Sequence, residues 1–209
     1  MIFKSSNPYH DLMLAYINKK YPDDKFEYRG PTGGGASAST KTIIVSSELY
    51  PEADVYVRYS TDGEIDTYSD NYMSVVYAKQ VESGLETLVE SLSDHISLFY
   101  SPSRYACPND TGPIDFQTYA RNKESSIGFT AVVYSQDIDK AIIEETLKTA
   151  VSDSGICCFG TVYFESSLDA ILQLSETSLS AYLFKHTYFA ALSFEADEAP
   201  QVITMEWEQ

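Results

Sequence analysis

A strand–helix–strand succession in the second half of the chain constrains the fold more than any other feature. Residues 128–134 form an apolar run, residues 138–151 carry apolar side chains at helical spacing, and residues 156–164 are rich in β-forming residues. Gly155 stands where the helix must end. A crossover of this length favours a right-handed connection between two parallel strands. The sequence therefore predicts a parallel pair in the sheet of this half.

Hairpins are predicted on both sides of this unit. Residues 54–60 alternate between apolar and polar side chains, and Thr61-Asp62-Gly63 predicts a tight turn into a strand at 64–68, because Asp-Gly readily adopts positive φ angles. Near the end of the sequence, strands at 187–194 and 202–207 flank an acidic loop and are expected to pair. The remaining predicted elements are helices over 8–21, 72–93 and 167–184, a helical turn over 116–120, and strands over 26–29, 41–47 and 96–100.

The pattern as a whole predicts an α+β protein, with helices packed on one face of mixed, largely antiparallel sheets. A chain of 209 residues suits one large domain or two similar-sized halves. We expect a single α+β protein over 1–209, with a candidate sub-domain boundary within 101–126. That segment holds three prolines and many turn-forming residues.

The net charge of the chain limits the classes of partner that we expect. It has 31 acidic against 14 basic side chains, a formal net charge of -17. Such a surface repels phosphates and anionic lipids, so we expect no nucleic-acid partner. No apolar run approaches the roughly 18 residues that span a bilayer, so no membrane span is expected. The first residues do not resemble a signal peptide, which leaves a cytoplasmic protein, or an extracellular or cell-envelope domain whose leader was removed.

Tyrosine is abundant, with 17 residues against a single Trp. Its apolar ring and hydrogen-bonding tip suit contacts with proteins or sugars. Tyr56, Tyr59, Tyr68 and Tyr72 follow the predicted strands and the start of the helix at 72–93. We interpret these four as candidate ligand-binding residues on one exposed face. The alternative is that they form core or cross-strand pairs.

Signatures of catalysis and metal binding are missing from the sequence. It has no GxSxG or SxxK motif, and no two histidines are spaced for a metal helix. Asp62, Glu64, Asp66 and Asp70 depart from the calcium-loop pattern and are expected to be a solvated hairpin face. We therefore assign no catalytic residue and expect no metal and no cofactor.

Three cysteines leave two alternatives open. Cys107, Cys157 and Cys158 are either buried small hydrophobic residues, or Cys107 pairs with one of the two neighbours in an oxidising compartment. A nucleophilic Cys107 assisted by a distant histidine is a third interpretation.

Segments of the first half resemble uncharacterised proteins of Gram-positive anaerobic bacteria. The similar segments are HDLMLAYINKKYPDDKFEYRG, KTIIVSSE, DVYVRY and DTYSDNYMSVVYAKQVESGLETLV. The resemblance covers about half of the chain and carries no known activity. It implies a bacterial origin and a cell-envelope setting, and it transfers no functional residue.

These observations together favour a non-enzymatic binding or interaction module of a bacterium. Its expected partner is a protein or a small neutral ligand, recognised by an aromatic patch in an acidic surface. One alternative is a hydrolase whose carboxylates or Cys107 meet only in the folded chain. Another is an acidic inhibitor that imitates nucleic acid and blocks a basic protein.

Overall fold

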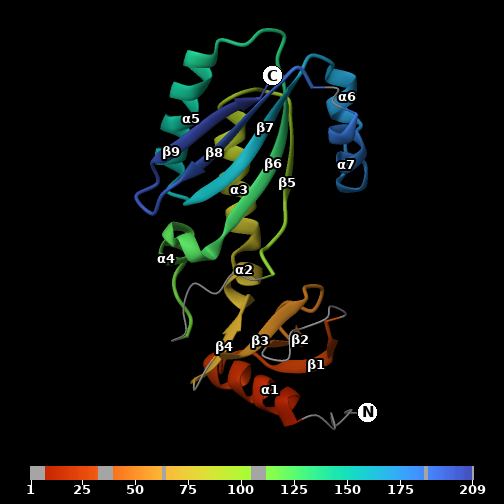
Figure 1. The fold of residues 1–209 in the computed structure, drawn as a ribbon, viewed down its shortest axis with the longest axis vertical. Coiled ribbons are helices and arrows are strands. Elements are labelled where there is room, and N and C mark those ends of the chain that lie inside the picture. The colour runs from red at the N-terminus through yellow and green to blue at the C-terminus, as the bar shows by residue number, and fades with distance from the viewer. Residues whose placement is uncertain (1–7, 33–39, 63–64, 105–111, 186–187, 209) are drawn as a thin grey trace. The chain divides into compact units, whose positions relative to one another are not determined.

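The structure is a computed structural model that describes residues 8–32, 40–62, 65–104, 112–185 and 188–208 (Figure 1). The chain divides into two compact units. The first unit comprises Met1–Tyr77 and Ser103–Asp115, and the second comprises Ala78–Pro102 and Phe116–Gln209. Each unit is therefore built from two separate segments of the chain. The expectation of a single domain with a boundary within 101–126 stays a prediction.

The first unit is a four-stranded antiparallel sheet in the order β1-β2-β3-β4, with α1 packed across one face (Figure 1). Its elements are α1 (Pro8–Lys20), β1 (Phe26–Pro31), β2 (Thr40–Ser47), β3 (Val55–Asp62), β4 (Ile65–Asp70) and α2 (Tyr72–Val76). Met13 and Ile17 of α1 are fully buried, as are the alternate residues Val55 and Val57 of β3. This alternation places one face of β3 in the core, as its sequence predicts.

The second unit is a five-stranded sheet in the order β5-β6-β7-β8-β9. Its elements are α3 (Ala78–Glu90), β5 (Ile96–Tyr100), α4 (Phe116–Arg121), the 3-10 helix η1 (Lys123–Ser125), β6 (Ile127–Tyr134), α5 (Lys140–Ser154), β7 (Cys158–Glu165), α6 (Leu168–Leu172), α7 (Glu176–Phe184), β8 (Ala190–Ala196) and β9 (Val202–Glu208). β6 and β7 pair in parallel around α5, and the other neighbours pair antiparallel. The predicted crossover and the predicted β8–β9 hairpin are both confirmed.

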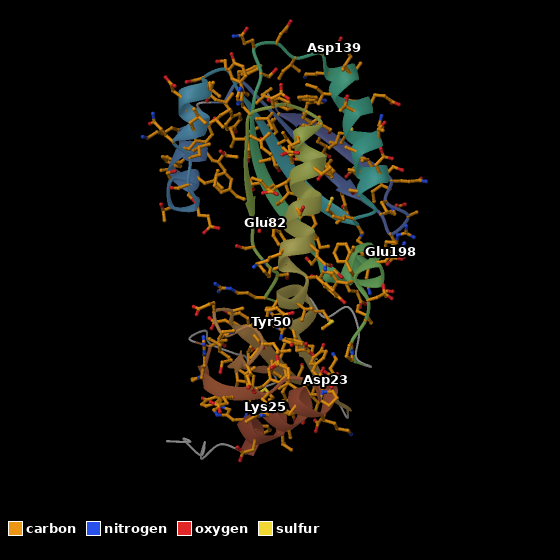
Figure 2. All side chains as sticks on the ribbon, turned by 180° about the vertical axis from the view of Figure 1, so that it is seen from behind. Asp23, Lys25, Tyr50, Glu82, Asp139 and Glu198 are labelled. Carbon is orange, nitrogen blue, oxygen red and sulfur yellow. The ribbon has the colours of Figure 1, made fainter. Side chains whose placement is uncertain are left out.

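Asp139 and Gly155 define the two ends of α5, the helix that connects the parallel strands. Asp139, at the start of the helix in Figure 2, accepts hydrogen bonds from the backbone N–H groups of Ala141 and Ile142 at 3.0 and 3.2 Å. Gly155 ends the helix with a φ of +66°, a backbone conformation that residues with a Cβ rarely adopt. The helix begins two residues later than predicted because Asp139 is its cap.

Helices α3 and α5 lie on one side of the sheet, and α6 and α7 lie on the other (Figure 1). The side toward α3 and α5 is the dry core, where Ala131, Val162 and Leu192 are fully buried. On the opposite side α6 contacts the sheet, and Ser97 Oγ of β5 donates a hydrogen bond to the Ile171 carbonyl at 3.1 Å. The α+β class predicted from the sequence is confirmed.

Two helices that were predicted to be continuous are each divided. The predicted helix over 72–93 is interrupted at Tyr77, which ends α2 with a φ of -98° and a ψ of 5°. The Tyr77 hydroxyl donates a hydrogen bond to the Ile114 carbonyl at 2.6 Å. The predicted helix over 167–184 is interrupted before Ser175. There the Ser175 backbone N–H donates to Ser178 Oγ at 2.9 Å, so a capping box begins α7.

We predict that Gly155→Ala lowers the free energy of unfolding by about 1 kcal/mol, because alanine disfavours the positive φ that ends α5. No atom lies within 4 Å of the added Cβ, so a clash does not contribute. Urea denaturation measures the loss. Gly155→Asn is the matched control and should lose less, because asparagine tolerates this conformation; equal losses would contradict the explanation.

Candidate functional site

The four tyrosines predicted to bind a ligand do not share one exposed face. Tyr59 and Tyr72 are only 6% and 4% exposed, so their rings belong to the core of the first unit. Tyr59 and Tyr68 are cross-strand partners with ring centroids 5.2 Å apart, which is the arrangement of the alternative interpretation. Tyr56 points to the opposite side of β3, where the Arg104 guanidinium lies 5.4 Å from its ring centroid.

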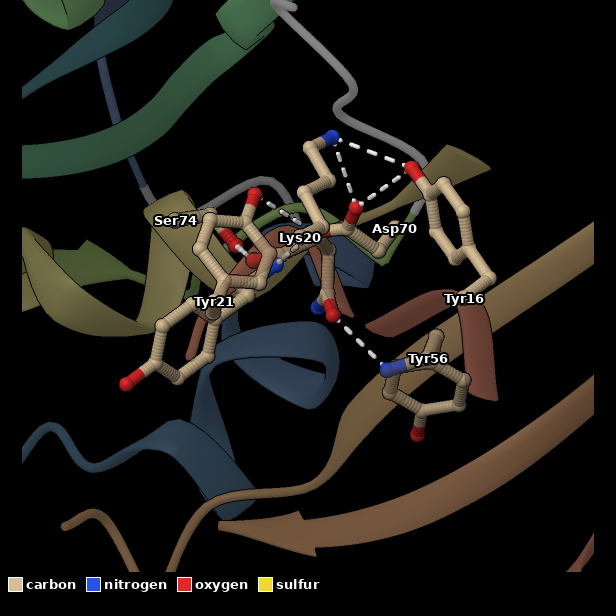
Figure 3. A network of polar contacts seen from close by, with 8 residues as sticks. Tyr16, Lys20, Tyr21, Tyr56, Asp70 and Ser74 are labelled. Carbon is tan, nitrogen blue, oxygen red and sulfur yellow. Dashed lines mark hydrogen bonds and ion pairs between the residues drawn. The ribbon is translucent and has the colours of Figure 1, made fainter. Parts of the chain in front are cut away.

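A buried carboxylate organises the tyrosines of the first unit (Figure 3). Asp70 Oδ2 accepts from Lys20 Nζ at 2.9 Å and from the Tyr16 hydroxyl at 3.0 Å. Asp70 Oδ1 accepts from the Tyr21 hydroxyl and from the Tyr72 backbone N–H, both at 3.0 Å. The side chains of Lys20 and Asp70 are only 5% and 1% exposed. This carboxylate is therefore a structural acceptor, not part of a solvated hairpin face.

A second buried carboxylate, Asp24, is connected to the first through Tyr72. It accepts from the Tyr72 hydroxyl at 2.6 Å, from Ser47 Oγ, and from backbone N–H groups that include that of Leu49 at 3.2 Å. Burial would raise the pKa of Asp24, but the hydrogen bonds from Ser47 and Tyr72 outweigh it and hold the pKa below its usual value. Burial and the bond to Asp24 raise the pKa of Tyr72, so this hydroxyl stays a donor.

We predict that acid destabilises the protein partly through Asp24. Because the pKa of Asp24 is lower in the folded protein than in the unfolded chain, ionised Asp24 stabilises the fold above the unfolded pKa, about 4. That contribution is lost as the pH falls below about 4 and through the folded-state pKa. Urea denaturation between pH 7 and pH 3 should show a shallower decline for Asp24→Asn than for the wild type. The exposed neighbour provides the control, since Asp23→Asn should keep the wild-type decline.

The remaining candidate groups for chemistry are structural or lie outside the described residues. Asp66 accepts from the Tyr59 hydroxyl at 2.9 Å, whereas Glu64 and Cys107 fall outside the described residues. Cys157 and Cys158 are buried thiols, and burial raises both pKa values, that of Cys158 to about 12. Neither thiol is therefore activated as a nucleophile at neutral pH.

The second unit carries a sheet surface that its helices cover only in part, which we call the open face. It is the side of β7, β8 and β9 that points away from α3 and α5. Strand pairing aligns its side chains in three rows across the strands, since partners in the register point to the same side. The rows are Phe159, Glu195 and Thr204; then Thr161, Ser193 and Glu206; then Tyr163, Ala191 and Glu208.

A groove of about 770 Å³ lies on the open face. Its aromatic wall is Phe159, whose side chain is 47% exposed. The ring lies against Gly128 of β6, where an added Cβ would be 2.6 Å from the ring. Hydroxyls line the floor, with Thr161 Oγ1 and Ser193 Oγ at 2.9 Å from each other. The groove thus combines an accessible aromatic surface with hydrogen-bonding groups.

Negative charge surrounds this groove. The second unit carries 18 acidic against 6 basic side chains, a net charge of -12. Lys123, beside the groove, forms an ion pair with Glu195 at 2.9 Å. Glu206 and Glu208 are exposed, and neither forms an ion pair with another described residue. The open face is therefore an acidic surface.

Phe159 is not among the candidate residues predicted from the sequence. β7 reads as apolar or β-forming at nearly every position, so its sequence does not reveal which side remains uncovered. The sequence contains only a weak indication of the exposed side of β7. Thr161 and Tyr163, which carry hydroxyls, alternate with Gly160 and Val162, which have no polar side chain. Only the positions of α3 and α5 show which of the two sets is exposed.

Comparisons with known proteins provide one structural neighbour. No protein-family model and no curated protein matches the sequence. A crystal structure of a DUF5037 family protein from Ruminococcus gnavus ATCC 29149 is similar with a TM-score of 0.43 and 10% identity over 92% of this chain and 93% of that chain. The source of this neighbour is a Gram-positive anaerobe. At this TM-score, the similarity carries no argument about function. In the described part of the chain, no helix has the length and apolarity needed to cross a membrane.

Proposed function

We propose that the protein is a non-enzymatic binding module and that the open face of the second unit receives its ligand, a protein segment or a small neutral molecule. One observation carries this proposal: the exposed ring of Phe159 forms a wall of a groove of about 770 Å³ lined by hydroxyls. Binding grooves combine an apolar surface with a few placed polar groups, and aromatic residues contribute much of the affinity.

The buried tyrosines of the first unit support this location indirectly. Four of the 17 tyrosines donate their hydroxyls to Asp24, Asp66 and Asp70, so these four serve the fold. Tyr56 is the exception among the four predicted residues, because its ring is half-buried on the other side of the sheet. It therefore marks the competing location for a ligand.

A hydrolase is the second candidate function, and the cysteines of the second unit give it little support. Burial raises the pKa of Cys157, and its Sγ donates to the Ala196 carbonyl at 3.4 Å. A thiol that is buried and protonated is a poor nucleophile. The open face also carries Glu195 in an ion pair with Lys123, an arrangement that suits positioning of a ligand as well as stability.

The experiment is a thermal-shift panel of neutral oligosaccharides and synthetic heptapeptides with wild type and Phe159→Ala. We predict that at least one compound stabilises the wild type by about 2.7 kcal/mol at a hundredfold excess over its Kd. Phe159→Ala should lower that affinity roughly tenfold or more, because truncating an aromatic anchor commonly costs 1 kcal/mol or more.

Two further variants control for location. Phe184→Ala removes another exposed ring, 85% exposed and outside the groove lining, and should bind like the wild type. Tyr56→Ala tests the first unit. Loss of binding in Tyr56→Ala with retention in Phe159→Ala would move the site to the first unit, and the absence of any Phe159-dependent shift would reject the proposal.

A further inference from the structure

The edge of the second sheet formed by β9 is the feature that specifies the ligand further. β9 is the last strand in the order β5-β6-β7-β8-β9, and its described residues pair with β8 alone. An edge strand offers a row of backbone N–H and C=O groups that can pair with an added strand. Seven residues, Val202–Glu208, form this edge, which is long enough for an extended peptide to bind along it.

Side chains along β9 alternate in chemistry as well as direction. Met205 and Trp207 point to the side of α5, where the Trp207 indole N–H donates to Glu144 at 2.9 Å. Glu206 and Glu208 point to the open face, about 7 Å apart along the strand. Ile203 is 52% exposed at the beginning of the strand. A peptide added to this edge would meet apolar side chains on one side and carboxylates on the other.

We propose that the ligand is an extended peptide that adds to β9 as a further strand, with Lys or Arg at alternate positions and apolar residues between them. This inference rests on the proposed function and names the class of its partner. Addition to a sheet edge is a recurring mode of peptide recognition, in which the backbone gives affinity and alternate side chains give specificity. Cationic residues at positions i and i+2 would lie opposite Glu206 and Glu208, and opposite charges across strands attract.

Charge complementarity favours a basic peptide over a second copy of the chain as the occupant of the β9 edge. A second copy of the chain would bring another unit with a net charge of -12, and antiparallel pairing centred on Glu206 would place two carboxylates opposite each other. Like charges in directly opposed positions destabilise strand pairing. The same field attracts a cationic segment and accelerates its association at low salt. A basic peptide is therefore the occupant that the edge favours.

The test uses a labelled heptapeptide of alternating Lys and Val, beginning and ending with Lys, with both termini blocked. Fluorescence anisotropy measures its Kd for the full chain. The same peptide with Glu in place of Lys, and a peptide with all Lys before all Val, are the sequence controls. We expect the alternating Lys peptide to bind at least tenfold more tightly than either control, and to weaken as salt is raised.

Matched variants locate the contact on the strand. Glu206→Gln with Glu208→Gln should weaken binding roughly three- to tenfold, since each cross-strand charge pair contributes about 0.2–1 kcal/mol. Glu86→Gln with Glu90→Gln makes the same change in net charge at exposed positions of α3 and should leave the Kd nearly unchanged. Equal weakening by both double variants would show attraction by net charge alone and would overturn the proposal.

Backbone methylation distinguishes strand addition from side-chain attraction. In an added strand, alternate N–H groups point toward β9, so N-methylation of either all Lys or all Val should abolish binding while the other pattern preserves it. Equal affinities for the two methylated peptides would overturn the strand model. If a neutral oligosaccharide shows Phe159-dependent binding while the Lys peptide does not bind, this inference fails and the proposed function stands.

Discussion

The carboxylate of Asp70 is the group on which the first unit depends most. It lies at the end of β4, yet its oxygens accept hydrogen bonds from Tyr16 and Lys20 of α1, from Tyr21 just beyond that helix, and from the first residue of α2. A buried charge is tolerated only when it is paired and its remaining lone pairs are satisfied. One aspartate thus requires a helix, a strand end and a second helix to be placed together. Tyr72 extends the same network to Asp24, because its backbone N–H donates to Asp70 and its hydroxyl donates to Asp24.

Local patterns predicted much of the fold because their causes are local. The strand Ile96–Tyr100 has the bounds that its sequence indicates, and Gly155 ends α5 as its position predicts. The interruptions of the two long helices were missed for different reasons. At Tyr77 the turn is accompanied by a hydrogen bond to Ile114, which is distant in sequence. At Ser175 the cap is local, but the segment is rich in serine and several positions could have begun a helix.

The candidate site was less predictable than the fold, because a site depends on which side of a sheet is covered. Aromatic residues at alternate positions have the same pattern whether they face a core or solvent, so the sequence could not separate Tyr59 from Phe159. The structure resolves this: α1 covers the side of β3 that carries Tyr59, whereas Phe159 points away from α3 and α5. The acidity of the chain, in contrast, was informative early. It predicts that polyanions are not partners, and the exposed carboxylates Glu206 and Glu208 lie on the open face.

The return of Ser103–Asp115 to the first unit has a consequence for how the chain is made. Asn71 Nδ2 and Ser74 Oγ both donate to the Ser103 carbonyl, at 3.1 and 3.2 Å. A ribosome that has finished Tyr77 has therefore produced all the strands of the first sheet without the acceptor for these groups. By the time residue 103 is synthesised, α3 and β5 have already been made, although β6, the strand that pairs with β5 in the second sheet, has not. Completion of the first unit thus waits for a later part of the polypeptide, and neither unit corresponds to a contiguous gene fragment.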